Sequence, residues 1–183
     1  MASSRIIISL LIVFAVLVVC TAVFAQQPDE HASQVVMRVG TFDSRAVAVA
    51  YARSENFMKH IRGLMDEYEK AKAAGDEKRV KELEAEGPAM QEMIHKQGFS
   101  TWPVDDILEQ IQDKIPEIAK QAKVDVIVSK WDIVYQLPGV EFVDVTDLLV
   151  VPFNPTKETL DIIKSLKEQE PVSLKELEEH GSD

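Results

Sequence analysis

The feature that most constrains the fold is a long stretch of helical periodicity from Ser44 to Lys123. Its apolar residues recur at alternating steps of four and three. That spacing is typical of the a/d seam of a coiled coil, in which two positions per heptad face one partner helix. The first seam consists of Phe57, Ile61, Leu64, Tyr68 and Ala71, and the second of Val104, Leu108, Ile111, Ile115, Ile118 and Ala122.

A turn signal separates the two seams. Gly75 can adopt the left-handed conformation that ends a helix, and Asp76 can cap the next helix. Residues 44–123 therefore predict a long antiparallel coiled-coil hairpin, whereas the alternative is two ordinary amphipathic helices of a globular domain.

Prolines are expected to divide the returning arm of this hairpin into pieces, because proline lacks the backbone donor and clashes with the preceding turn. Breaks are predicted at Gly87-Pro88 and between Gly98 and Pro103, and a kink is predicted at Pro116.

Runs of β-branched residues predict short strands on both sides of the hairpin. One strand is expected over Val35–Phe42, with Asp43 or Ser44 capping the helix that follows. Further strands are expected over Val124–Ser129, Asp132–Gln136 and Val140–Val145. The predicted fold class is therefore α+β, with a small β-sheet base, a long antiparallel coiled-coil hairpin inserted between its strands, and C-terminal helices. So small a sheet buries little apolar surface, which favours self-association through the base.

The chain divides into four predicted segments: a signal peptide at 1–25, a flexible leader at 26–34, a domain at 35–151 and a helical tail at 152–183. Within the domain, the hairpin takes 44–123 and the β base takes 35–43 and 124–151. In the tail, Asn154 is expected to cap a helix that starts at Pro155, and a capping box from Ser173 to Glu176 predicts a last short helix. The tail is charged and is expected to pack loosely.

The first 25 residues have the pattern of a secretory signal. Arg5 precedes the apolar run Ile6–Val19, and Val23-Phe24-Ala25 forms a cleavage signal. Cleavage after Ala25 predicts a periplasmic or secreted protein without stable membrane insertion. The alternative is an uncleaved membrane anchor, because the apolar run from Ile6 to Ala25 is long enough to span a bilayer. Cleavage would remove the single cysteine, Cys20, and with it disulfide and thiolate chemistry.

The net charge argues against two classes of partner. The formal charge is −11, and loss of Arg5 makes it −12. So acidic a chain is expected to bind neither nucleic acid nor anionic lipid. It can attract basic segments of a partner protein.

Two segments of the chain resemble the Skp/OmpH family of periplasmic chaperones. Residues 38–47, RVGTFDSRAV, are similar to the strand that passes through a glycine and an acidic residue into the family's first helix. Residues 124–129, 133–135 and 143–148 are similar to its closing segment. The resemblance covers about 35–149. It implies a homotrimer with a β-rich base and helical arms that hold unfolded outer-membrane proteins without ATP.

The sequence therefore favours a non-enzymatic holdase without cofactors. Its candidate client contacts are the large apolar residues along and beside the seams, Phe57, Ile61, Met65, Met90, Met93, Phe99 and Trp102. The alternative is an envelope structural or adaptor protein with one specific partner, which the acidic charge favours. A metal site or an enzyme is a weaker interpretation, because Glu92 and His95 form only one E-x-x-H pair, and no nucleophile or phosphate-binding motif is present.

Overall fold

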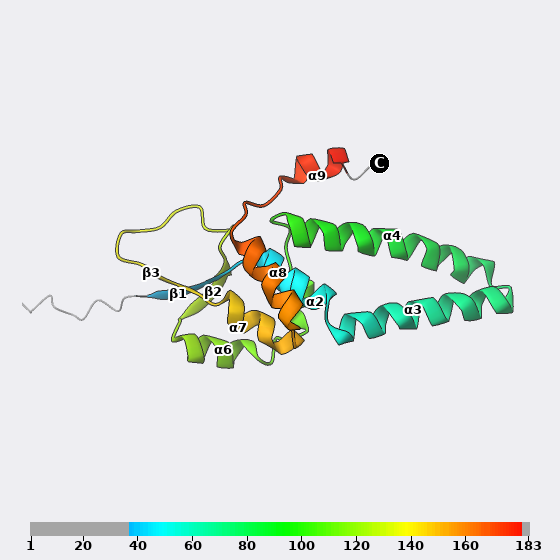
Figure 1. The fold of residues 1–183 in the computed structure, drawn as a ribbon, viewed down its shortest axis with the longest axis horizontal. Helices are drawn as coiled ribbons and strands as arrows, with labels where there is room; N and C mark the ends of the chain where they lie inside the picture. The colour runs from blue at the N-terminus through cyan, green and yellow to red at the C-terminus, as the bar shows by residue number, and fades with distance from the viewer. Residues whose placement is uncertain (1–36, 181–183) are drawn as a thin grey trace, which may run out of the picture. The chain divides into compact units, whose positions relative to one another are not determined.

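The computed structural model describes residues 37–180, which form eight α-helices and three strands (Figure 1). The predicted signal peptide and leader lie outside the described residues. In chain order the elements are β1 Arg38–Phe42, α2 Ser44–Ala52, α3 Glu55–Ala74, α4 Glu77–Phe99, α5 Asp105–Glu109, α6 Ile115–Ala122, β2 Val126–Ser129, β3 Glu141–Asp144, α7 Thr146–Val150, the 3₁₀ turn η1 Val151–Phe153, α8 Lys157–Lys167 and α9 Leu174–His180.

The three strands form one parallel sheet in the order β2-β1-β3. Gly40, at the centre of β1, is in register with Ile127 of β2 and Val143 of β3. Residues in register share a face of the sheet, and neighbours along a strand alternate between faces. Ile127 and Val143 pack against the helical core, so this face of the sheet is covered.

The adjacent row of the sheet points to the opposite face. It consists of Val39, Val126 and Phe142, and Val126 is 39% exposed. Parallel sheets normally have both faces covered, because their strands are apolar on both sides. This row is therefore an apolar surface that the described part of the chain leaves partly open.

Helix α2 is the centre of the core. Ala46, Val47, Ala48 and Ala50 are almost completely buried, and their small size lets neighbouring helices approach closely. Helix α2 packs against α4, α7 and α8. The start of α2 agrees with the sequence, because the Asp43 side chain caps it.

The predicted fold class is wrong. The structure is mostly helical around a small all-parallel sheet, and a sheet base carrying a long coiled-coil hairpin is not formed. Residues 44–123 are divided among five helices, α2 to α6. The physical reason is that the second seam packs elsewhere. Its residues Val104, Ile111 and Ile118 are buried in one core with α2 and do not face the first seam.

Prolines act differently from the prediction at two places. Helix α4 continues through Pro88, although the chain does leave the helical conformation after Phe99. Helix α6 has Pro116 in its first turn, where proline needs no backbone donor, so this proline starts a helix instead of kinking one.

The strand predicted over Asp132–Gln136 is also absent, and those residues belong to the connection between β2 and β3. Because β2 and β3 are parallel and lie on opposite sides of β1, this connection has to run back along the sheet. It leaves Val134 98% exposed, together with Tyr135 and Leu137.

Helix α8 belongs to the core, contrary to the expectation of a loosely packed tail. Ile163 and Thr159 are each 2% exposed. The cap of this helix is Thr156, whose side chain accepts a hydrogen bond from the N–H of Thr159, whereas Asn154 ends η1 in the left-handed conformation.

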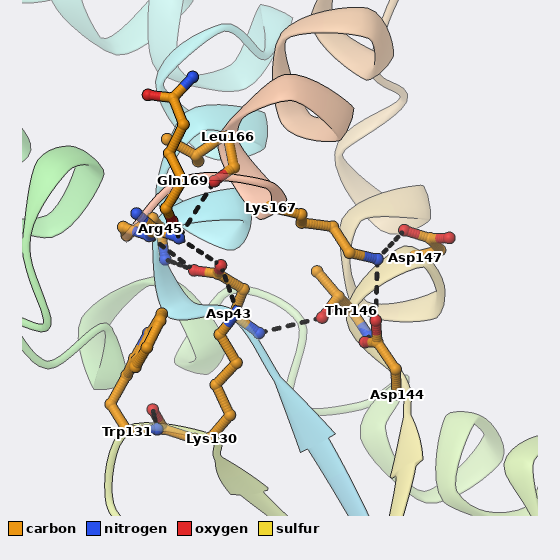
Figure 2. A network of polar contacts seen from close by, with 11 residues as sticks. Asp43, Arg45, Lys130, Trp131, Asp144, Thr146, Asp147, Leu166, Lys167 and Gln169 are labelled. Carbon is orange, nitrogen blue, oxygen red and sulfur yellow. Dashed lines mark hydrogen bonds and ion pairs between the residues drawn. The ribbon is translucent and has the colours of Figure 1, made fainter. Parts of the chain in front are cut away.

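A buried polar network fixes the junction between β1 and α2 (Figure 2). Asp43 and Arg45 are each 1% exposed, and their side chains form two hydrogen bonds of 3.1 and 2.8 Å. Lys130 Nζ lies 2.8 Å from the Asp43 carboxylate. The Arg45 guanidinium also donates to the backbone carbonyls of Leu166 and Gln169, at 3.1 and 2.8 Å. The network therefore ties the start of α2 to the end of α8.

A second set of contacts in Figure 2 joins β3 and α7 to α8. Lys167 Nζ lies 2.9 Å from Asp144 and 3.2 Å from Asp147. The Thr146 hydroxyl accepts a hydrogen bond from the backbone N–H of Asp43 at 3.0 Å. These groups satisfy one another within the chain, so we assign the two networks to stability.

Candidate functional site: an apolar groove between α3 and α4

An open groove with a volume of about 630 Å³ lies between α3 and α4. This volume is within the range of about 300–1,000 Å³ that is usual for ligand sites. We call it the α3–α4 groove, and its lining residues are Phe57, Ile61, Leu64, Met65, Tyr68 and Glu69 of α3, and Leu83, Glu84, Glu86, Gly87, Pro88, Met90, Gln91, Ile94 and His95 of α4.

Local signals in the sequence place the two helices side by side. Ser54 caps α3 through a hydrogen bond from the Phe57 N–H to its hydroxyl, and Asp76 caps α4 in the same way through the N–H of Arg79. Between them, Gly75 has a φ of +69°, which ends α3 and reverses the chain. Figure 1 shows the resulting antiparallel pair of helices, coloured green-cyan and green.

Side-chain contacts join the pair near the turn. Arg79 Nε donates to Glu67 at 2.8 Å, and the Tyr68 hydroxyl donates to Glu84 at 3.2 Å. At the opposite end of α3, the Phe57 ring packs against Tyr51 of α2 with centroids 5.2 Å apart. The groove therefore lies between a polar contact near the turn and an aromatic contact near the core.

The first seam of the sequence forms the floor of the groove. Phe57 and Leu83 are buried, whereas Ile61, Leu64, Tyr68, Met90 and Ile94 are half-buried. They stay half-buried because the facing helix does not close over them. Met65 is 64% exposed and stands at the edge. Methionine side chains are flexible and polarisable, so they adapt to apolar partners of different shapes.

Gly87 and Pro88 open one wall of the groove. A side-chain Cβ at Gly87 would have no atom within 4 Å, so the space beside it is empty. Pro88 has no N–H to donate to the carbonyl of Glu84, one helical turn earlier. The bond from residue 88 that this carbonyl would accept in a regular helix is therefore missing.

The charged residues that line the groove are all acidic. Glu69, Glu84 and Glu86 line it, and neither lysine nor arginine does. The Glu84 carboxylate accepts the Tyr68 hydrogen bond. Lys72 lies close to this part of the lining, with its Nζ 5.7 Å from the centroid of the Tyr68 ring.

Four of the seven candidate contact residues meet in the groove: Phe57, Ile61, Met65 and Met90. Met93, Phe99 and Trp102 do not line it. Phe99 is exposed beside His95, with ring centroids 5.8 Å apart, and its carbonyl accepts a hydrogen bond from the Val172 N–H. The Trp102 ring lies 5.1 Å from Lys96 Nζ.

Two features of this site are not predicted by the sequence. Leu64 and Tyr68 belong to the first predicted seam, although they line an open groove. The three glutamates Glu69, Glu84 and Glu86 form an acidic rim, which the sequence does not predict because their common position depends on how α3 and α4 pack. Their positions beside the seam were the only signal that the sequence offered.

In the described range 37–180, no helix is long and apolar enough to cross a membrane. Over the same residues, no group of three or more His, Cys, Asp or Glu side chains is placed to hold a metal ion. Comparisons of the chain with protein-family models, curated proteins and solved structures found no match.

Proposed function

We propose that the protein is a non-enzymatic, ATP-independent holdase of the Skp/OmpH type, which binds unfolded outer-membrane proteins in the periplasm. The observation that carries the proposal is the α3–α4 groove, an open apolar cavity of about 630 Å³ lined by Phe57, Ile61, Met65 and Met90. A signal peptide at residues 1–25 would export the chain to the compartment in which such clients occur.

The groove suits a non-native polypeptide for a physical reason. Unfolded β-barrel chains expose apolar side chains at alternating positions, and each can occupy the groove for a small gain in buried surface. An acidic surface around the groove keeps the complex soluble while several weak contacts hold the client. No covalent step or cofactor is needed for this task.

The family assignment within the proposal rests on the order of local elements. A strand passes through Gly40 into the Asp43 cap and a buried helix, and the chain closes with β2, β3 and α7. That order matches the segments in which the sequence resembles Skp/OmpH proteins.

We also propose that the protein forms homo-oligomers through its sheet, with a trimer as the state that the resemblance implies. The open row with Val126 and the exposed Val134, Tyr135 and Leu137 support a second copy as the occupant. The chain itself supplies both halves of such an interface: within residues 37–180, β2 and β3 each have one unpaired edge, and Asp132–Gln136 has strand propensity but forms no strand.

The holdase function is tested by diluting a urea-unfolded outer-membrane β-barrel into buffer with the exported protein and following light scattering. We expect the protein in molar excess to delay aggregation. Met90→Asp puts a charge in the groove and should remove most of the delay. Met93→Asp adds the same charge on the same helix outside the groove and should preserve the delay.

Absence of any delay with the unaltered protein would reject the holdase function. Equal activity of the two variants, both shown by circular dichroism to be folded, would reject the groove as the binding site.

An adaptor that binds one folded partner is the second candidate, and the rim of Glu69, Glu84 and Glu86 favours it because a basic partner surface would fit there. Binding stoichiometry separates the two functions. A holdase binds many unrelated unfolded chains, whereas an adaptor saturates with one folded partner.

A further inference from the structure

We propose that the α3–α4 groove selects polypeptide segments in which lysine or arginine stands beside apolar residues. This inference rests on the proposed function only in that the groove binds polypeptide, and it holds for an unfolded client or a single partner. It names the chemistry of the occupant: apolar side chains for the floor and cationic side chains for the rim.

The first step is the distribution of ion pairs on the two helices. Three of the five glutamates on these helices that do not line the groove have cationic partners: Glu67 and Glu82 bind Arg79, and Glu92 binds Lys96. The three rim glutamates are different. Among the described residues, Glu69, Glu84 and Glu86 form no ion pair within 4.0 Å, so their negative charge is available to a ligand.

The second step is the position of these carboxylates beside an apolar floor. Tyr68 lies on the floor and donates its hydroxyl hydrogen to Glu84, which holds that carboxylate at the groove. A lysine or arginine side chain can lay its methylene stem along such a floor while its charged end reaches the rim. The methylene stem would then have an apolar contact and the charged end a carboxylate partner at the same time.

The third step is an additional acceptor. Pro88 leaves the backbone carbonyl of Glu84 without its helical donor, so a cationic N–H group can donate to it. The Glu84 carboxylate accepts one hydrogen bond from Tyr68 and has further acceptor capacity, so it and the carbonyl of the same residue can both accept from such a group.

The charge also discriminates against other apolar ligands. Fatty acids, anionic lipids and acidic apolar segments would bring a negative charge to the three carboxylates and be repelled. The groove is therefore suited to cationic amphipathic segments and unsuited to anionic amphiphiles of the same apolar content.

The test uses the exported protein and three fluorescent peptides with the same apolar residues, in which the intervening positions are all lysine, all glutamine or all glutamate. Binding is measured by fluorescence anisotropy at low and high salt. We expect the lysine peptide to bind about tenfold more tightly than the glutamine peptide at low salt. The glutamate peptide should bind most weakly, and high salt should reduce the differences.

Substitutions test whether the rim glutamates cause the preference for the lysine peptide. Glu69→Gln, Glu84→Gln and Glu86→Gln together should remove the preference for lysine, so that the lysine and glutamine peptides bind with equal affinity. The matched control is Glu109→Gln, Glu117→Gln and Asp132→Asn together. It changes the net charge equally at exposed positions outside the groove and should keep the preference.

Equal affinities for the three peptides would overturn this inference and leave the holdase proposal standing. A preference that survives the rim variant, or is lost equally in the control, would overturn the groove as its origin. Tighter binding of a fluorescent fatty acid, competing with the lysine peptide, would replace polypeptide by lipid as the occupant. Failure of all three peptides, together with no delay of aggregation, would reject the proposed function as well.

Discussion

At the scale of single residues, the buried pair of Asp43 and Arg45 decides how β1 is followed by α2. Asp43 caps the helix and binds the Arg45 guanidinium, which in turn holds two carbonyl groups at the end of α8. Removing one partner of such a pair leaves a buried charge uncompensated and typically costs about 3–5 kcal/mol. A two-residue sequence signal therefore connects elements more than a hundred residues apart.

The same pair predicts loss of stability in acid. Burial alone would raise the pKa of Asp43, but Arg45 and Lys130 lower it more, so the pKa in the folded state lies below the ordinary value of 3.8. Stability from such a carboxylate is present above the unfolded-state pKa and is lost as pH falls through the folded-state pKa. We expect the free energy of unfolding, measured with urea, to decrease below about pH 4. The free energy of unfolding of the Asp43→Asn variant should decrease less over this pH window. An equal decrease in the variant and in the unaltered protein would contradict the assignment of the effect to Asp43.

Gly40 predicts a second effect at this scale. A Cβ at this position would lie 3.1 Å from side-chain atoms of both Ile127 and Val124, which is closer than normal contact. We expect Gly40→Val to lower the free energy of unfolding by about 1–3 kcal/mol through overpacking. Gly63→Ala is the control, because a Cβ there meets no atom within 4 Å and should raise stability by about 0.5–1 kcal/mol. A tolerated valine would mean that β2 can move away from β1.

At the scale of elements, α3 and α4 show how an apolar seam becomes a groove. The residues of the first seam face the other helix, as in a coiled coil, but they remain half-buried over much of its length. Gly87 and Pro88 stand where a coiled coil would need side chains and backbone bonds that close the gap. Their presence favours an open site at some cost in helix stability.

Pro88→Ala should therefore stabilise α4. The alanine N–H can donate to the carbonyl of Glu84, and alanine is preferred over proline in a helix interior by about 3 kcal/mol in model systems. We expect slower amide hydrogen exchange in α4 after Pro88 and a free energy of unfolding higher by about 1–3 kcal/mol. Unchanged exchange rates would contradict a destabilising effect of Pro88 on α4.

At the scale of the whole molecule, the sheet is the part whose apolar surface stays partly exposed. One face packs on the core, the row with Val126 on the other face is partly open, and the β2–β3 connection exposes Val134, Tyr135 and Leu137. Exposed apolar residues that lie together mark interaction surfaces more often than scattered ones do.

Self-association predicts a solution mass above that of the monomer by multi-angle light scattering, with three copies as the proposed number. Replacing Val134 and Leu137 by serine should lower the mass, because it removes apolar contact area from the interface. Replacing Leu160 and Ile162 of α8 by serine exchanges two other exposed apolar residues and should leave the mass unchanged. A monomer for the unaltered protein would refute assembly through the sheet.

The sequence by itself determined the local elements of this protein. Asp43 caps the start of α2, Gly75 ends α3, and Asp76 caps the start of α4. Short strands form within three of the four β-branched runs. It also gave four of the residues that line the groove. These features depend on backbone conformation, capping and periodicity within a few residues, so they can be inferred without knowledge of the fold.

Only the tertiary structure decided which surfaces those elements bury. The two seams have the same spacing, yet the second packs into the core around α2 while the first stays half open. Thr156 rather than Asn154 caps α8, and Arg45 holds that helix in the core. An apolar repeat predicts that one face of a helix will be buried, but it does not predict which element will cover that face. The packing of the whole chain decides between the competing elements.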